Sequence, residues 1–277
     1  MIQTAGIELC TESFGNPDDA PVLLIAGISA SMLWWEEDFC QRLAAGGRFV
    51  IRYDHRDTGR SVTDEPGRPG YSGGDLVADA AGILDAYGLR AAHIVGVSAG
   101  AAFAQLLALD FAPRVLSLVL ISSSPALPGD YPLPPAADQF GRFMASAAVD
   151  WSDASSVTEY LVDYSRVLAG GRRPFDEAGT RDLVRRDVGR ARDVAARQNH
   201  GFISDDGRSR GPLSSISVPT LVIHGTADPL FPVEHGEALA AEIPGARLLR
   251  LLDAGHGVER ADWPTIIPAI LDHTQPL

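Results

Sequence analysis

The fold is predicted from one stretch of sequence, Ala92-His93-Ile94-Val95-Gly96-Val97-Ser98-Ala99-Gly100. An apolar run typical of a buried strand leads into a Gly-x-Ser-x-Gly pattern, and an alanine-rich helical stretch follows it. The two glycines let the backbone turn sharply, so that Ser98 can adopt a strained conformation with its hydroxyl exposed. This strand–turn–helix context is what a nucleophile elbow requires. The pattern alone is weak, because a small-residue loop also suits a helix that packs closely on a sheet.

Two residues further along the chain supply the rest of a catalytic triad. A serine hydroxyl becomes an effective nucleophile when a base takes its proton and a third group orients that base. The predicted strand 218–224 runs into a loop that contains Asp228, and the predicted strand 246–252 is followed by His256 between two glycines. The order serine, acid, histidine, each after a strand, is that of the α/β-hydrolase arrangement. We therefore predict Ser98 as nucleophile, His256 as base and Asp228 as orienting acid.

Other residues fit these roles less well. The preceding strand, 117–121, is followed by three serines and a proline rather than by a carboxylate. Asp228 has one alternative interpretation, as the residue that begins a turn before a proline. The other histidines lie on predicted strands, on a helix, near the C-terminus or in polar segments: His93, His224, His235, His273, His55 and His200.

The reaction also needs an oxyanion hole, which is usually made by two backbone N–H groups. One is expected to be the amide of Ala99, directly after the nucleophile and at a helix N-terminus. The other is expected from the loop after strand 22–25, at Ile28, because Gly27 permits the bend that turns the next amide inward. Ser29 is interpreted as a plain loop residue.

The segment from Arg52 to Ser61, Arg-Tyr-Asp-His-Arg-Asp-Thr-Gly-Arg-Ser, carries a family resemblance. The chain resembles the α/β-hydrolase superfamily over nearly its whole length. In this segment it is similar to the anthracycline (aclacinomycin) methylesterases and to serine esterases that open macrolide lactones. The resemblance implies a mostly parallel, eight-stranded type of sheet with helices on both faces. Within the segment, Asp54 and Arg56 are interpreted as residues that brace the loop by hydrogen bonds.

The periodicity divides the chain into a core, residues 1–124 and 213–277, and an inserted helical segment, residues 125–212, which we call the cap segment. Helices are expected over 75–87 in the core and over 139–148, 155–168 and 180–198 in the cap segment. Arginines of the cap segment are expected mostly on a solvated face paired with acids: Arg181, Arg185, Arg186, Arg190, Arg192 and Arg197.

Composition fits one α/β domain. The chain has 277 residues, of which 45% are hydrophobic, enough for a substantial core. No signal segment or membrane-spanning run is visible, and only Cys10 and Cys40 are present, so a reducing cytoplasm is expected. A net charge of −13 argues against nucleic acid or anionic membranes as partners. Because no metal-ligand spacing or phosphate-binding loop occurs, neither a metal nor a cofactor is expected.

A bound small-molecule ester is the expected partner, and the protein is expected to be a monomer or a homodimer. The cap segment would supply the substrate pocket, in which specificity resides. Candidate pocket residues, each of which could equally be a core residue, are aromatic or flexible apolar side chains: Trp34, Trp35, Phe140, Met144, Tyr160 and Tyr164.

The predicted activity is two-step acyl transfer on a bulky apolar ester, such as a macrolide lactone or a polyketide methyl ester. Three alternatives stay open at this point. The first is a C–C bond or other acyl hydrolase with the same triad, and the second is a cofactor-free peroxidase-type hydrolase. The third is a ligand-binding member of the fold without turnover.

Overall fold

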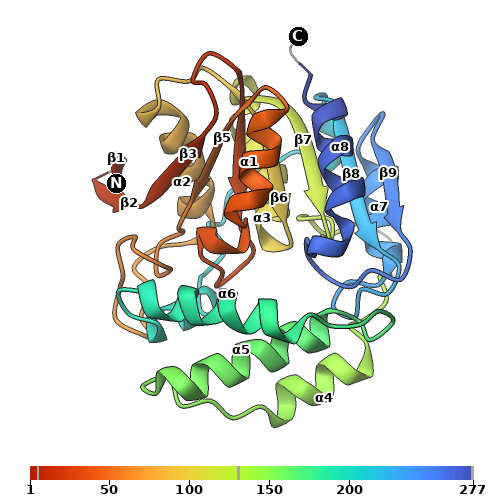
Figure 1. Ribbon diagram of the computed structural model, residues 1–277. Coiled ribbons are helices and arrows are strands. Elements are labelled where there is room, and N and C mark those ends of the chain that lie inside the picture. Colours follow the sequence, from red (N-terminus) through yellow and green to blue (C-terminus); the bar gives the residue numbers. More distant parts are fainter. Residues whose placement is uncertain (5, 130–131, 276–277) are drawn as a thin grey trace.

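Seven strands form the central sheet of the computed structural model, which describes residues 1–4, 6–129 and 132–275 (Figure 1). In spatial order they are β3 (Thr11–Phe14), β5 (Arg48–Tyr53), β4 (Ala20–Ile25), β6 (Ala92–Val97), β7 (Val115–Ile121), β8 (Thr220–Gly225) and β9 (Arg247–Leu251). The edge strand β3 runs antiparallel to β5, and all other neighbours are parallel. The predicted mostly parallel sheet is confirmed.

Helices cover both faces of this sheet. On one face lie α1 (Glu37–Ala45) and α8 (Trp263–His273), and on the other lie α2 (Gly73–Ala86), α3 (Ala99–Asp110) and α7 (Val233–Glu242) (Figure 1). Strand β4 shows why both faces need cover. Its Leu23 and Ile25 pack toward α2 and α3, whereas Val22 and Leu24 pack toward α1 and α8. A strand that is buried on both faces has a continuous apolar sequence, and this pattern is what predicts the parallel strands from the sequence.

The N-terminal strands differ from the eight-stranded pattern. Strands β1 (Ile2–Thr4) and β2 (Ile7–Leu9) pair with each other in a separate two-stranded sheet. Between β2 and β3, the N–H of Cys10 donates to Ser61 Oγ and its carbonyl accepts from the N–H of Asp54. Because these bonds go to a loop, the strand ladder is interrupted at Cys10 and the main sheet has seven strands among the described residues.

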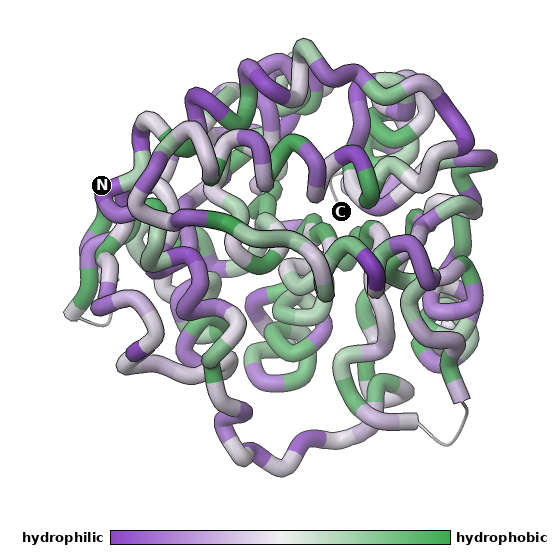
Figure 2. Tube along the Cα trace, turned by 90° about the horizontal axis from the view of Figure 1, so that it is seen from below, coloured by the Kyte–Doolittle hydropathy of each residue, from purple (hydrophilic) through white to green (hydrophobic). Residues whose placement is uncertain are grey.

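The cap segment contributes three helices, α4 (Asp138–Ser146), α5 (Ala154–Leu168) and α6 (Glu177–Arg190), followed by the 3-10 helix η3 (Ala195–Gly201). These helices lie together at one end of the sheet, with α6 nearest to it (Figure 1). Seen from that end, they carry both hydrophilic and hydrophobic residues (Figure 2), which is typical of helices with one packed face. Residues 130–131 of the cap segment lie outside the described residues, and the division into core and cap segment stays a prediction.

One predicted helix of the cap segment ends early. The pattern indicated a helix over 180–198, but α6 stops at Arg190 because Ala191 adopts an extended conformation, with φ −63° and ψ 139°. The next amide, that of Arg192, donates to the carbonyl of Gly59 in the core. This contact turns the chain, so that η3 approaches the loop after β4.

Short 3-10 helices complete the connections: η1 (Met32–Trp34), η2 (Ala112–Arg114), η4 (Leu213–Ser215) and η5 (Arg260–Asp262). Cys10 and Cys40 are both buried and unpaired by disulfides, in agreement with a packing role. Across the described ranges, no helix has the length and apolar character needed to span a membrane.

Candidate active site

Ser98 occupies the sharp turn between β6 and α3. Its backbone has φ 56° and ψ −124°, a strained combination for a residue with a side chain. The Ser98 N–H donates to the carbonyl of Ile121 at 2.9 Å, and the Ser98 carbonyl accepts from the first turn of α3. Ser98 is partly exposed, although the strand before it is buried. The turn therefore presents the hydroxyl at the carboxyl edge of the sheet.

Two glycines make this turn possible by allowing backbones to approach each other. A Cβ at Gly96 would overlap the carbonyl oxygen of Gly100, and a Cβ at Gly100 would overlap the carbonyl oxygens of Ile25 and Ala26. Neither glycine has a positive φ, so their role here is space rather than conformation. The glycines of the motif thus set how closely α3 packs against the ends of β4 and β6.

Asp228 and His256 lie together in the loops after β8 and β9. His256 Nδ1 is 2.8 Å from Asp228 Oδ2, and the other carboxylate oxygen accepts from the amides of Leu230 and Phe231 at 2.9 and 2.8 Å. The Asp228 side chain is fully buried. With Nδ1–H donating to the carboxylate, Nε2 of His256 is left as a proton acceptor. The Phe231 ring lies edge-on to the imidazole, 5.6 Å between centroids.

Two serines after β7 connect the turn at Ser98 with the loop that carries His256. Ser123 Oγ donates to the carbonyl of Ser98 at 3.0 Å. Its neighbour Ser122, which has a φ of 47°, accepts a hydrogen bond on Oγ from the N–H of Gly257 at 3.1 Å. In the sequence this serine run stands out only because it lacks a carboxylate, so its bracing role is not predicted. The positive φ of Ser122 left no signal in the sequence.

The end of α5 packs on the histidine loop. The N–H of His256 donates to the carbonyl of Leu168 at 2.8 Å. A Cβ at Gly255 would overlap the carbonyl of Leu168, and a Cβ at Gly170 would overlap that of Ala227. The cap segment is therefore in direct backbone contact with the loops that carry Asp228 and His256.

The expected oxyanion donors flank Ser98. Gly27 lies next to it, since a Cβ at Gly27 would be 3.5 Å from Ser98 Cβ. Among the described residues, no group accepts a hydrogen bond from the N–H of Ile28. The amide of Ala99 is in the first turn of α3, where helical amides lack an intrahelical acceptor. Gly27 has no positive φ; the conformation that bends the loop belongs to Ser29, with φ 61°.

The loop from Arg52 to Ser61 is braced as expected. The Asp54 carboxylate is fully buried and accepts from the amides of Met32 and Arg60, both at 2.9 Å. Arg56 forms a two-donor ion pair with Asp79 of α2 at 2.7 and 2.8 Å. Both side chains thus hold the loop in place beside the segment after β4.

The arginines of the cap segment only partly follow the expected solvated face. Arg181 and Arg186 form exposed pairs with Glu159 and Asp182. Arg190 is half-buried and Arg197 is buried instead, because each pairs with a buried carboxylate. Arg190 Nη1 is 2.8 Å from Asp54 Oδ1, and Arg197 Nη2 is 2.8 Å from an oxygen of Asp187.

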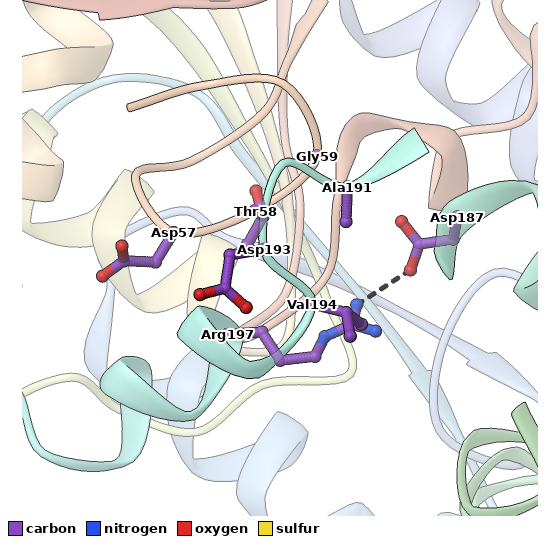
Figure 3. Close-up of a pocket in the computed structure, with 8 residues that line it drawn as sticks. All are labelled: Asp57, Thr58, Gly59, Asp187, Ala191, Asp193, Val194 and Arg197. Atoms are coloured by element: carbon purple, nitrogen blue, oxygen red, sulfur yellow. Dashed lines mark hydrogen bonds and ion pairs between the residues drawn. The ribbon is translucent and has the colours of Figure 1, made fainter. Parts of the chain in front are cut away.

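Figure 3 shows the Arg197–Asp187 pair beside a cavity between residues 57–59 and residues 187–197. The cavity volume is about 10 Å³, which is room for about one water molecule. It is too small for an organic substrate. We therefore interpret it as part of the packing between the cap segment and the core.

The two tryptophans proposed for the pocket have different surroundings. Trp35 is 1% exposed and packs with α1 and α8, its ring 5.5 Å from that of Phe39. Trp35 is therefore a residue of the hydrophobic core, which was the alternative to its expected place in a substrate pocket. Trp34 packs against apolar residues of the cap segment, and its Nε1 donates to Asp187 at 3.2 Å.

The four candidate pocket residues of the cap segment also differ in their surroundings. Tyr160 stacks with both Phe143 and Tyr164, and Phe140 meets Tyr164 edge-on, forming an aromatic cluster between α4 and α5. Met144 is 48% exposed and makes none of these ring contacts. Phe143 was missed in the sequence, although it lies on the same helix as the residues that were named.

Tyr164 is the member of this cluster with an electrostatic connection to the triad candidates. Burial, together with the nearby Tyr160 hydroxyl and the Asp228 carboxylate, raises the pKa of Tyr164 to about 12. The hydroxyl therefore stays neutral at physiological pH.

Comparisons with known proteins give a consistent family. The model of the alpha/beta hydrolase fold family matches residues 20–258. The chain is 36% identical to the rhodomycin D methylesterase of Streptomyces peucetius over 295 residues, which cover 99% of this chain and 97% of that enzyme. The methylesterase of the same name from Streptomyces sp. strain C5 matches equally. The resemblance to anthracycline methylesterases inferred from residues 52–61 is confirmed.

Solved structures agree on the fold. An esterase from Exiguobacterium antarcticum has a TM-score of 0.77 at 21% identity, covering 99% of this chain and 98% of that one. A meta-cleavage product hydrolase from Pseudomonas fluorescens IP01 has a TM-score of 0.75 at 20% identity, covering 98% and 96%. At these identities, the likeness establishes the architecture alone.

Proposed function

This chain belongs to the α/β-hydrolase fold family and is an ester-bond hydrolase, and we propose that it acts through a serine acyl-enzyme formed at Ser98. The observation that carries the proposal is the presence of a strained, partly exposed Ser98 and a hydrogen-bonded Asp228–His256 pair in loops at the same edge of the sheet. The serine run after β7 links the two, because Ser123 bonds to Ser98 and Ser122 bonds to the histidine loop.

The proposed reaction has two steps. His256 Nε2 takes the Ser98 proton while Oγ attacks the ester carbonyl, and the amides of Ile28 and Ala99 stabilise the oxyanion. The C–O bond to the leaving alcohol then breaks, and His256 returns the proton to that alcohol. In the second step water attacks the acyl-enzyme with His256 as base, which releases the carboxylic acid and regenerates Ser98. Asp228 holds the imidazole orientation and stabilises the imidazolium.

The proposed substrate is a bulky, largely apolar ester, with a polyketide methyl ester favoured. Support comes from the aromatic cluster of Phe140, Phe143, Tyr160 and Tyr164, whose flat rings suit a fused-ring compound. The rhodomycin D methylesterases named above are similar over almost the whole chain. Burial of apolar surface at about 25 cal/mol per Å² would favour a multi-ring ester over a short aliphatic one.

The nucleophile is tested by labelling and by mutation. A fluorophosphonate should label wild-type protein at Ser98 alone, as read by peptide mass spectrometry. Ser98→Ala should lower kcat on a p-nitrophenyl ester by about 10⁴-fold or more while circular dichroism stays unchanged. Labelling at another serine, or turnover by the variant near the wild-type rate, would contradict the assignment.

The acid is tested in the same assay. Asp228→Asn should lower kcat by about 10⁴-fold with little change in KM, because the amide favours the wrong imidazole tautomer. Asp253→Asn is the matched control, since Asp253 also precedes His256 in the chain but lies exposed. A large loss in Asp253→Asn together with an active Asp228→Asn would reassign the acid.

The substrate class is tested by competition between esters. The enzyme should show a higher kcat/KM for an anthracycline methyl ester than for p-nitrophenyl acetate. Mass spectrometry should detect loss of one CH₂ from a methyl ester or gain of one water by a lactone. A preference for the small ester would leave the triad assignment intact and remove the proposed substrate class.

A further inference from the structure

The loop expected to carry one oxyanion donor is a β-turn with an unusual residue in it. The N–H of Ala30 donates to the carbonyl of Gly27 at 3.2 Å, which closes a four-residue turn with Ile28 and Ser29 in the centre. Ser29 has a φ of 61°, whereas Ile28 is not among the residues with positive φ. This combination is that of a type II turn, in which the third position usually holds glycine. Here a serine adopts the conformation instead.

Two residues of the cap segment hold every polar group of Ser29. Its N–H donates to Nδ1 of His200 at 2.7 Å. Its carbonyl accepts from Nε and Nη2 of Arg197 at 2.9 and 2.6 Å. Its hydroxyl donates to the carbonyl of Arg197 at 2.9 Å. These contacts span about 170 positions of sequence and form only because η3 turns back to the core.

Arg197 and His200 are themselves held in place by hydrogen bonds to other residues. Arg197 is buried and pairs with the buried carboxylate of Asp187, to which Trp34 also donates. His200 is 2% exposed, and its Nε2 lies 2.8 Å from the carbonyl of Arg56, to which it donates. Nδ1 must therefore be the unprotonated nitrogen that accepts from Ser29. Burial lowers the pKa of His200 to about 3, in keeping with a neutral ring.

We propose that His200 and Arg197 are positioning residues of the oxyanion hole, which hold the Gly27–Ala30 turn so that the N–H of Ile28 faces Ser98. The inference rests on the proposed function. The two residues do not touch the reacting atoms; they act through Ser29. A type I turn would reverse the peptide between Ile28 and Ser29 and point the Ser29 N–H away from His200. The hydrogen bond to His200 therefore selects the type II form.

The test separates the two nitrogens of His200 by a pair of substitutions. In asparagine, Oδ1 can take the place of Nδ1 and accept from Ser29, so His200→Asn should keep kcat within about threefold. In glutamine, the amide reaches toward the Arg56 carbonyl and the acceptor near Ser29 is lost. His200→Gln should therefore lower kcat by about 10- to 100-fold, less than removal of a whole oxyanion donor, with KM nearly unchanged.

The assay uses a p-nitrophenyl ester, with active sites counted by fluorophosphonate labelling so that kcat refers to folded enzyme. Arg192→Gln is the matched control. It also removes a contact between cap segment and core, the ion pair of Arg192 with Glu8, but it leaves the turn untouched. Its kcat should equal that of the wild type.

A rescue experiment sharpens the result. Glycine adopts a positive φ freely, so Ser29→Gly added to His200→Gln should restore part of the lost kcat. If His200→Gln does not fold, Arg197→Lys serves in its place, because lysine keeps a cation for Asp187 but loses the two-donor contact with Ser29. It should lower kcat to a similar extent.

Several outcomes would overturn the inference. These are an unchanged kcat in His200→Gln, an equal loss in His200→Asn, or an equal loss in Arg192→Gln. A wild-type protein that neither reacts with the fluorophosphonate nor hydrolyses the ester would contradict the proposed function, and this inference with it. Wild-type labelling at Ser98 with normal turnover in His200→Gln would contradict the inference alone.

Discussion

The turn at Ser98 and the turn Gly27–Ala30, which we call the nucleophile turn and the oxyanion turn after their proposed roles, lie side by side but are held in different ways. The turn at Ser98 depends on two glycines of its own motif, since Gly96 and Gly100 lack the Cβ atoms that would block the close approach of the backbones. The turn at Ser29 has the same kind of strained residue, with φ 61° against 56°. The residues that hold it by hydrogen bonds, His200 and Arg197, belong to η3, near the C-terminal end of the cap segment. A strained residue can thus depend mainly on small residues of its own motif, as at Ser98, or mainly on side chains from a distant segment, as at Ser29.

This difference predicts how the two turns respond to change. The nucleophile turn should be sensitive to added volume at its glycines, because backbone carbonyls surround them. The oxyanion turn should be sensitive to lost hydrogen bonds, because polar contacts hold it.

Among substitutions that leave Ser98, Asp228 and His256 intact, the largest effect is expected at Ile28, where one substitution removes the proposed donor but suits the turn. Proline is favoured at the second position of a type II turn, so Ile28→Pro should keep the turn and delete the N–H. We expect kcat to fall by about 10²- to 10³-fold, which corresponds to about 2.7–4 kcal/mol. Ile28→Ala keeps the N–H, and because the Ile28 side chain is 42% exposed it should retain most activity. Steady-state kinetics on a p-nitrophenyl ester measures both, and equal losses would show that the side chain matters.

A smaller effect, on stability, is expected at Gly100. In Gly100→Ala the new methyl group would overlap the carbonyls of Ile25, the last residue of β4, and of Ala26, the residue after it; these backbone atoms cannot easily move. The free energy of unfolding should fall by about 3 kcal/mol. Gly141→Ala is the matched control, since a Cβ there meets nothing within 4 Å and α4 should gain about 0.5–1 kcal/mol. Urea unfolding measures both, and similar values for the two variants would remove the packing argument.

The smallest effect is expected on the pH dependence of the free energy of unfolding, because each of the two regions contains a buried histidine. Burial lowers the pKa of His200, beside the oxyanion turn, to about 3 and that of His93, on the strand before Ser98, to about 4. An unfolded chain has histidine pKa values near 6.5 and so binds more protons between about pH 4 and 6.5. The free energy of unfolding should therefore fall as the pH falls through this range, by up to about 1.4 kcal/mol per pH unit for each histidine.

His93→Asn provides the measurement, because its side-chain oxygen can replace Nδ1, which lies 2.8 Å from Ser117 Oγ. Urea unfolding at pH 7, 6 and 5 should give a shallower pH dependence for His93→Asn than for wild type, and a similar change for His200→Asn. Parallel curves for wild type and variants would show that these histidines titrate alike in the folded and unfolded states.

The sequence by itself determined the parts of the protein that local pattern controls. Apolar runs buried on both faces indicated the parallel strands, and glycines around Ser98 indicated the turn. The loops after two strands placed Asp228 and His256 at one edge of the sheet, where the structure brings their side chains to 2.8 Å. These predictions needed no knowledge of distant contacts, because the carboxyl ends of parallel strands meet at one edge.

Only the tertiary structure decided the parts that depend on residues far apart in sequence. Trp35 packs in the core while its neighbour Trp34 contacts the cap segment, and no local pattern separates adjacent tryptophans. Arg197 and His200 looked like polar surface residues until the early end of α6 brought η3 against Ser29. A buried polar side chain is stable only when its partners are in place, and those partners are set by the folded chain rather than by its neighbours in sequence.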